Sequence, residues 1–306
     1  MKASIVPILL CAAISLPVRA QNSSANLITA AGYLYPSPVT VAPGQVITLF
    51  VAGLGQGDIT VTVRQGTDLA APVLDVRPAS TCNEVQPGAC GALTAVTVQI
   101  PYEVWSACVT NVCPNIVFLT QIFVTQNGAA GALFTISPFG DHIHFLTTCD
   151  TVVSSGSGFA PITGLPCAPF VTHAGGSLVS ASNPALGNEE LVAYATGLGA
   201  TNPATPTGQA ASAATPTQQN FLLSFNFLAN ALPARPTYPL NVALTSYATP
   251  LFTGLTAGYV GLYQVNFRVP PPPTDYAPCD NFVQSNLTVN MGGQYSFDGA
   301  AICVIP

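Results

Sequence analysis

Hydrophobic and polar residues alternate with a period of two in several short stretches of the chain. The alternation is regular in Ile59–Val63, Val96–Ile100, Tyr263–Val269 and Leu287–Met291. Successive side chains of a strand point to opposite faces, so each stretch predicts a β-strand with one buried side and one solvent-facing side. Val46–Val51 is apolar at nearly every position, which is typical of a strand that is covered on both faces.

Turn-forming residues separate these stretches. Asn127-Gly128, Gly175-Gly176 and Gly292-Gly293 are hairpin-turn pairs, and 28 prolines are spread along the chain. Many short strands joined by Gly and Pro turns predict an all-β fold of antiparallel sheets, arranged as a sandwich or a barrel. Gln218–Leu232 also fits a helical face, but its β-rich surroundings favour a strand.

The N-terminus has the pattern of a secretory signal peptide. Lys2 precedes an apolar run from Ala3 to Val18, and Val18-Arg19-Ala20 places small residues at the cleavage positions. The alternative of a lipoprotein anchored at Cys11 would place bulky Leu10 before the cysteine and cut the apolar run in half. We therefore expect residues 1–20 to be removed. No later apolar run is long enough for a transmembrane helix.

Charge narrows the range of functions once the leader is set aside. Lys2 and Arg19 are its basic residues, so the remaining chain has no lysine, four arginines and twelve carboxylates, with a formal charge of −8. Nucleic-acid binding requires basic clusters, and none is present. The low charged fraction of 6% also excludes coiled coils and charge-rich disordered proteins.

Eight cysteines remain after the leader, and an even number in an exported chain indicates disulfides. Eight cysteines allow 105 pairings. Because they occur as four sequential couples, we expect nearest-neighbour bonds that staple loops. Zinc binding is the weaker alternative, since no Cys-x-x-Cys pair occurs. The expected pairs are Cys82–Cys90, Cys108–Cys113, Cys149–Cys167 and Cys279–Cys303.

A weak internal sequence repeat predicts two modules. Gly44–Gly55 resembles Gly187–Gly199, and in both a hydrophobic strand leads into a Gly-Leu-Gly turn. Val96–Pro101 likewise resembles Gln264–Pro270, a strand that ends at proline. Repeated units of this size indicate related folding modules. The expected organisation is a leader at 1–20, an N-terminal module at 21–137 and a C-terminal module with inserted loops at 138–306.

Seven short motifs recur in the order typical of one family of exported proteins. They are Ala42–Gln45, Ile100-Pro101, Ala132–Thr135, Ser182–Ala185, Tyr194–Gly199, Pro206–Gly208 and Gly258–Asn266. Together they resemble the Solibacter-type C-terminal domain family of acidobacteria and their relatives. The resemblance runs from Leu27 to the C-terminus, and it implies a pair of Ig-like antiparallel β-sandwich modules without an established activity. The eight cysteines and the Phe139–Pro169 insertion depart from the family's pattern.

Asp141-His-Ile-His-Phe145 is the sharpest candidate for chemistry. On a strand, His142 and His144 would lie on one face, close enough to share a metal ion with a third ligand such as Asp150. The competing and favoured interpretation is a polar strand face, because Ile143 and Phe145 alternate with the histidines. No catalytic set and no cofactor site is predicted.

Other polar and aromatic groups fit structural roles. His173 enters the Gly175-Gly176 turn, and Glu189-Glu190 is interpreted as an exposed pair of turn residues. A sugar-binding platform would need several exposed, coplanar aromatic rings. The candidates for such a platform are Tyr33, Tyr35, Trp105 and Tyr276.

The expected function is therefore that of an exported, non-enzymatic structural, adhesive or binding protein of bacterial origin. We expect it to be secreted, periplasmic or at the cell surface, where it would contact a protein or polysaccharide and no nucleic acid. Catalysis needs positioned acids, bases or metals, and these are sparse here. The alternatives are a carbohydrate-binding module and a metal-dependent hydrolase that uses the Asp141–His144 region.

Overall fold

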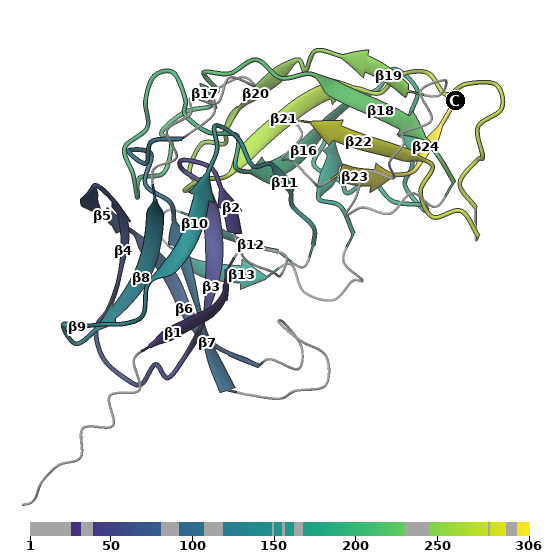
Figure 1. Ribbon diagram of the computed structural model, residues 1–306. Coiled ribbons are helices and arrows are strands. Elements are labelled where there is room, and N and C mark those ends of the chain that lie inside the picture. Colours follow the sequence, from purple (N-terminus) through teal and green to yellow (C-terminus); the bar gives the residue numbers. More distant parts are fainter. Residues whose placement is uncertain are drawn as a thin grey trace, which may run out of the picture.

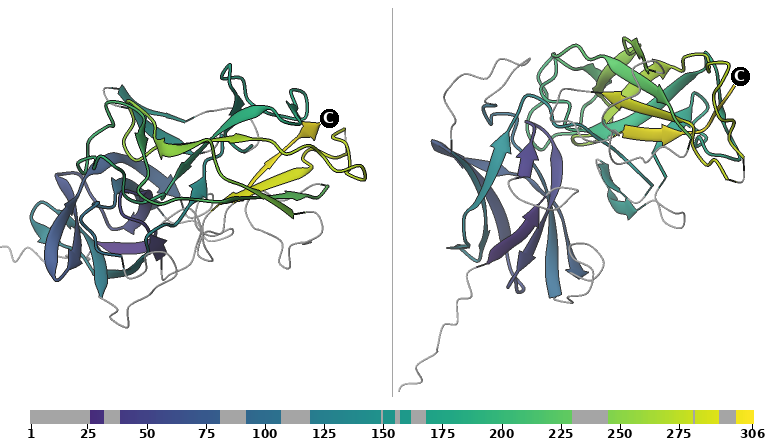
Figure 2. Two further views of the ribbon diagram at one scale, coloured as in Figure 1. Left: turned by 90° about the horizontal axis from the view of Figure 1, so that it is seen from above. Right: turned by 45° about the vertical axis from the view of Figure 1, so that its right-hand side comes forward.

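The computed structural model describes residues 26–31, 39–80, 92–106, 119–148, 150–154, 157–161, 168–229, 245–280, 282–291 and 299–306. The expected leader and Cys82, Cys90, Cys108, Cys113, Cys149 and Cys167 lie outside these residues. Every regular element in the described part is a β-strand, and most strand pairs are antiparallel. The prediction of an all-β chain is confirmed. The strands form two groups, the first coloured purple to teal and the second teal to yellow in Figure 1, and both views of Figure 2 show the same two groups.

The first group contains two sheets. One has the order β1-β3-β7-β6 and is antiparallel throughout, whereas the other has the order β2-β10-β8-β4-β5, with β9 paired to β8. In the second sheet β2 and β10 run parallel. The strands are β1 (Leu27–Ala31), β2 (Val39–Val41), β3 (Val46–Ala52), β4 (Ile59–Gln65), β5 (Thr67–Ala71), β6 (Val73–Ser80), β7 (Ala92–Gln99), β8 (Thr120–Gln126), β9 (Ala129–Ala130) and β10 (Phe134–Pro138).

A hydrophobic core draws buried side chains from both of these sheets. Leu49 of β3 and Val98 of β7 are fully buried, and so are Val63 of β4 and Ile122 of β8. Val63 and Val98 occupy apolar positions of period-two stretches, and Leu49 lies in the stretch that is apolar at nearly every position. All members of this N-terminal core lie between Ile28 and Ile136.

The second group begins with β11. One sheet has the order β11-β16-β21-β20-β17, with β14 paired to β16, and a four-stranded sheet has the order β19-β18-β22-β23. Two smaller pairs are the antiparallel β12–β13 and the parallel β15–β24. The strands are β11 (His144–Phe145), β12 (Thr151–Ser154), β13 (Ser157–Pro161), β14 (Val171–His173), β15 (Ala185–Leu186), β16 (Glu190–Thr196), β17 (Thr215–Pro216), β18 (Leu223–Phe227), β19 (Thr245–Ala248), β20 (Phe252–Leu255), β21 (Tyr263–Arg268), β22 (Leu287–Met291), β23 (Gly299–Ile302) and β24 (Val304–Ile305).

The C-terminal core is a separate cluster whose members lie between Ile143 and Val304. Phe225 of β18 packs against Phe267 of β21, with ring centroids 5.9 Å apart, so this core also joins two sheets. The ambiguous stretch 218–232 contains strand β18, and Leu223, Phe225 and Phe227 are buried there. The preference for a strand is confirmed.

The repeated sequence stretches occupy corresponding places in the two groups. β3 pairs antiparallel with β7, and β16 pairs antiparallel with β21. Both β3 and β16 end at a glycine with positive φ, 80° at Gly53 and 81° at Gly197. A residue without a side chain adopts this conformation readily, so the first glycine of each Gly-Leu-Gly motif has the same backbone conformation.

Candidate functional site at the junction of the two cores

The Ala42-Pro-Gly-Gln45 motif forms the turn between β2 and β3, and Gln45 closes it. The backbone N–H of Gln45 donates to the Ala42 carbonyl at 3.1 Å, while the Gln45 side-chain Oε1 accepts from the Ala42 N–H at 2.8 Å. Both residues are fully buried. Only the amide nitrogen of the Gln45 side chain therefore points beyond the turn.

That nitrogen bonds to the other group of strands. Gln45 Nε2 donates to the His142 carbonyl oxygen at 3.0 Å and lies 3.3 Å from His142 Nδ1. Because an amide NH₂ group only donates, the second contact is a hydrogen bond in the tautomer whose Nδ1 carries a lone pair. The His142 backbone N–H in turn donates to the Gly197 carbonyl at 2.8 Å. His142 thus connects the β2–β3 turn of the first group to the Gly-Leu-Gly motif that follows β16.

Position 197 requires glycine for two reasons: its φ is positive, and there is no room for a side chain at this contact. A Cβ atom there would lie 2.0 Å from the His142 carbonyl oxygen and 3.1 Å from Gln45 Nε2. The first distance is far below any van der Waals contact between carbon and oxygen. A side chain at position 197 would separate the two backbones.

A second buried glutamine makes a parallel connection. Gln99, at the end of β7, is fully buried; its Nε2 donates to the Gly44 carbonyl at 3.2 Å and its Oε1 accepts from the Gly208 N–H at 2.7 Å. Gly261 approaches the same place, since a Cβ atom there would lie 2.9 Å from the Gly44 carbonyl oxygen. Gly208 and Gly261 belong to motifs of the second half, so motif residues of both halves meet here.

Two tyrosines complete the junction. The hydroxyl of Tyr263 is fully buried and donates to the Gly199 carbonyl at 2.5 Å, so the Tyr102 hydroxyl, 3.2 Å away, donates to the Tyr263 oxygen. Burial raises the pKa of Tyr102, and burial together with the neighbouring Tyr102 raises that of Tyr263 well above 10.0. Both phenols therefore stay protonated and act as hydrogen-bond donors within the junction.

The rim of the junction is polar and partly exposed. The Thr207 hydroxyl accepts from the Tyr102 N–H at 3.0 Å and donates to the Glu103 carboxylate at 2.7 Å. On the other side, Gln219 Nε2 donates to the Gly140 carbonyl at 3.1 Å. The bonds made by Gln45, Gln99, Tyr102 and Thr207 join the two groups of strands, and the chemistry of the arrangement is that of a structural joint.

The predicted metal-ligand candidates have separate partners. Only His144 belongs to β11, while His142 precedes that strand and bonds to Gln45. His142 therefore lies just outside the strand, but the expected alternation is present, since Ile143 and Phe145 are buried and both histidines are half-buried. His144 Nε2 lies 3.2 Å from Asp150 Oδ2, so the structure joins His144 to Asp150. The described residues contain no group of three His, Cys, Asp or Glu side chains placed to hold a metal ion.

Asp150 has a local structural role. Its Oδ2 accepts from the Thr147 N–H at 2.6 Å and from the Thr147 hydroxyl at 2.8 Å, in addition to contacting His144. Burial of this carboxylate favours its neutral form, but the hydrogen bonds and the charge of His144 outweigh burial and lower the pKa of Asp150. The carboxylate closes the turn at 147–150.

A second histidine–carboxylate pair was not predicted from the sequence. His173 Nδ1 lies 2.5 Å from Glu189 Oε1, and His173 Nε2 lies 3.2 Å from the Asn183 carbonyl oxygen. Glu189 does end a turn, because its N–H donates to the Leu186 carbonyl, but its side chain is only 25% exposed and contacts His173 instead of being fully solvated. The pair follows from the register of β14 against β16. This register places His173 opposite Leu191, and Glu189 lies only two residues before Leu191.

Two of the four aromatic candidates, Trp105 and Tyr276, lie in the described part of the chain. The Trp105 backbone is held by a two-point contact with the Gln65 amide, both distances being 2.7 Å, and its side chain is 46% exposed. Tyr276 packs against the C-terminal core and is partly buried. Tyr33 and Tyr35 lie outside the described residues.

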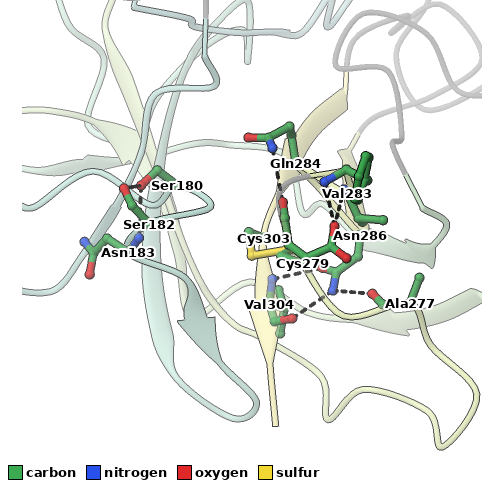
Figure 3. Close-up of a disulfide and its surroundings, with 12 residues drawn as sticks. Ser180, Ser182, Asn183, Ala277, Cys279, Val283, Gln284, Asn286, Cys303 and Val304 are labelled. Atoms are coloured by element: carbon green, nitrogen blue, oxygen red, sulfur yellow. Dashed lines mark hydrogen bonds between the residues drawn. A yellow bond between two sulfur atoms is a disulfide. The ribbon is translucent and has the colours of Figure 1, made fainter.

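The expected Cys279–Cys303 disulfide is present and has a Cα–Cα distance of 5.9 Å. Next to it, the buried Asn286 side chain donates to the Val304 and Ala277 carbonyls and accepts from the Val304 N–H (Figure 3). These bonds hold the 277–286 segment against β24. The other three expected disulfides fall outside the described residues and remain predictions.

Comparison with known protein families finds no match for this chain, and no curated protein matches it. The resemblance to the Solibacter-type domain therefore remains a prediction. In the described part of the chain, none of the elements is a helix capable of crossing a membrane.

Proposed function

We propose that this chain is an exported, non-enzymatic structural or binding protein in which two Ig-like β-sandwich modules are joined at a fixed angle. One observation carries the proposal: the motif residues of both halves are used in a buried joint. Gln45, Gln99, Gly197 and Tyr263 all make contacts within it. Specific, buried, fully bonded polar groups favour one relative orientation over others.

The strand order supports Ig-like modules at residues 21–137 and 138–306. In the first group, β1-β3-β7-β6 corresponds to the A-B-E-D sheet of an immunoglobulin-type sandwich, and β10-β8-β4 corresponds to G-F-C. The second group repeats the order in β14-β16-β21-β20 and β23-β22-β18. Both groups also contain a short parallel pair, β2–β10 and β15–β24, between an early strand and a late one.

The pairing of charged groups supports a non-enzymatic role. His144 contacts Asp150, His173 contacts Glu189, and two exposed ion pairs join Arg64 to Asp68 and Arg268 to Glu190. A general acid or base must be able to reach a substrate proton. In the described part of the chain, these side chains are instead bonded to their structural partners.

A rigid joint suits a protein that presents its loops and sheet edges to another surface. Binding residues are often carried on loops that a firm scaffold positions. The negative charge and absence of lysine in the mature chain disfavour anionic lipid headgroups. A protein or polysaccharide surface outside the cell is the proposed partner.

Two measurements on the mature chain, residues 21–306, test this function. Beads carrying the protein are incubated with peptidoglycan, cellulose, chitin and intact Gram-negative cells, and retention on at least one of these surfaces is expected. The soluble protein is assayed against chromogenic esters, glycosides and peptides, and no turnover above buffer is expected. Failure to be retained by any surface, or turnover of any substrate class, would overturn the proposal.

A carbohydrate-binding module is the second candidate, and the exposure of Trp105 favours it. An indole ring on a backbone fixed by Gln65 is pre-organised for stacking on a sugar ring. Under this alternative, Trp105→Ala abolishes retention on cellulose or chitin and leaves retention on protein-bearing surfaces unchanged. Retention of the variant on the polysaccharide would reject it.

A further inference from the structure

The strands β16, β21 and β20 lie side by side in one sheet (Figure 1), which has one face on the C-terminal core and one face turned away from it. Ala193 of β16 and Val265 of β21 lie opposite each other and belong to the core. Successive side chains of a strand point to opposite faces, so the next opposed pair, Tyr194 and Gln264, lies on the outer face. Asn266 lies on the same face, two residues beyond Gln264. All three outer side chains are half-buried.

Aromatic rings lie on both sides of the two amides. Phe170, which precedes β14, stacks on Tyr194 with ring centroids 4.8 Å apart. On the other side, Phe252 of β20 is opposite Asn266, and its ring lies over Gly254, because a Cβ atom at Gly254 would be 2.6 Å from Phe252 Cζ. Two strand spacings separate β16 from β20, so the aromatic groups are about 10 Å apart across β21. This span matches two linked sugar units.

The two amides between the rings hold each other in place and leave other polar groups available. Gln264 Nε2 donates to Asn266 Oδ1 at 3.2 Å. In the part of the chain that the structure describes, Gln264 Oε1, Asn266 Nδ2 and the Tyr194 hydroxyl make no hydrogen bond, and none of these atoms is fully buried. The outer face therefore offers an acceptor, a donor and a hydroxyl that can do both.

We propose that this aromatic–amide face binds a neutral polysaccharide chain. The inference rests on the proposed surface-binding function and assigns the polysaccharide to a face other than the one that carries Trp105. A sugar ring presents apolar C–H groups that stack on aromatic rings, and its hydroxyls both donate and accept hydrogen bonds. The members of the aromatic–amide face are Phe170, Tyr194, Phe252, Gln264 and Asn266.

The charges around the aromatic–amide face favour a neutral polymer over an acidic one. On β16, β21 and β20 the charged side chains are Glu190 and Arg268, which lie opposite each other and form an ion pair. Their charges offset each other beside the face. The chain after residue 20 carries a formal charge of −8, which repels polyuronates and other acidic polymers.

Affinity electrophoresis of the mature chain, residues 21–306, tests the assignment. Native gels contain hydroxyethylcellulose, mixed-linkage β-glucan, arabinoxylan or galactomannan as neutral polymers, and polygalacturonate as an acidic one. We expect retardation by at least one neutral polymer and none by polygalacturonate. Tyr194→Ala and Gln264→Ala should each weaken that binding about tenfold, because one removes a stacking ring and the other a hydrogen-bonding group. Equal retardation by the neutral polymers and by polygalacturonate would reject the preference for neutral chains.

Two control variants should bind as the wild type does. Trp105→Ala changes the exposed indole, and Gln121→Ala changes a half-buried glutamine on the outer face of the N-terminal β10-β8-β4 sheet. Tyr194 also packs on Phe170, so Gln264→Ala is the variant that leaves the aromatic stacking intact. Near-ultraviolet circular dichroism checks that each variant is folded.

The outcomes separate this inference from the function on which it rests. Wild-type affinity in folded Tyr194→Ala and Gln264→Ala would overturn the assignment to this face and leave surface binding standing. Retention on intact cells without retardation by any neutral polymer would also overturn it, since the partner would then be a protein. Lack of retention on every surface would instead end the proposed function itself, and the inference with it.

Discussion

Replacement of Gln45 by methionine tests whether the junction depends on specific hydrogen bonds. Methionine keeps a similar length and volume but removes the amide. The variant loses the bond from Nε2 to the His142 carbonyl and the bond from the Ala42 N–H to Oε1. Each is a net contribution of about 0.5–1.5 kcal/mol in an ordinary setting.

Loss of the Gln45 amide should destabilise the fold more than loss of an exposed hydrogen-bonding group. Ala42 and Gln45 are both 0% exposed, so water cannot reach the Ala42 N–H once its acceptor is gone. A buried donor without a partner costs about 1–3 kcal/mol. We therefore expect Gln45→Met to lower the free energy of unfolding by about 2–4 kcal/mol.

The assay is urea unfolding of the mature chain at pH 7 with disulfides intact, followed by near-ultraviolet circular dichroism. Gln126→Met is the matched control: its amide also makes two hydrogen bonds, to the Gly55 N–H and carbonyl at 3.1 and 2.7 Å, but in an exposed setting. Water replaces those bonds, so a loss below about 1 kcal/mol is expected. Equal losses in the two variants would refute the reasoning that the buried joint stabilises the fold.

Three further changes have expected outcomes. Gly197→Ala should lower the free energy of unfolding in urea by at least about 3 kcal/mol, because its Cβ would lie 2.0 Å from a backbone carbonyl oxygen. The control Gly176→Ala has a similar φ of 84° but open space around it, so a loss of only about 1 kcal/mol is expected. Equal losses in the two variants would contradict the steric argument. Replacing Cys279 and Cys303 together by serine, which opens a bridge across a sequence separation of 24, should lower the unfolding free energy by about 3 kcal/mol, and an unchanged midpoint would reject this. The lowered pKa of Asp150 stabilises the fold above the unfolded-state value of about 3.9, and this stability is lost as pH falls through the folded value. Asp150→Asn should flatten the stability profile between pH 5 and pH 2, and an unchanged slope would count against the assignment.

The period-two pattern was sufficient to locate strands. Ile59–Val63 and Leu287–Met291 lie in β4 and β22, with the expected alternation placing Val61 and Val289 in the cores. The pattern predicts strands because alternate side chains of one strand lie on the same face of its sheet. Whether that face is apolar can therefore be read from a few neighbouring residues. Pairing each cysteine with the nearest one in the sequence also predicted the Cys279–Cys303 disulfide.

The same pattern did not predict which side chains meet across strands. Gln45 and His142 are 97 positions apart, and His173 and Glu189 are 16 apart. Such contacts depend on strand register and on the orientation of one sheet group against the other. Neither quantity is encoded in the periodicity of a single segment.

The sequence by itself predicted several of the strands, the apolar positions that are buried in them and one disulfide, and it predicts export through the leader pattern and the charge. Only the tertiary structure showed that the glycine and glutamine motifs form a joint and that His142 and His144 have separate partners. The physical reason is the difference in sequence separation. Burial of an apolar strand face follows from residues that are close in the sequence. A hydrogen bond between distant residues forms only when the whole fold brings donor and acceptor within a few ångströms of each other.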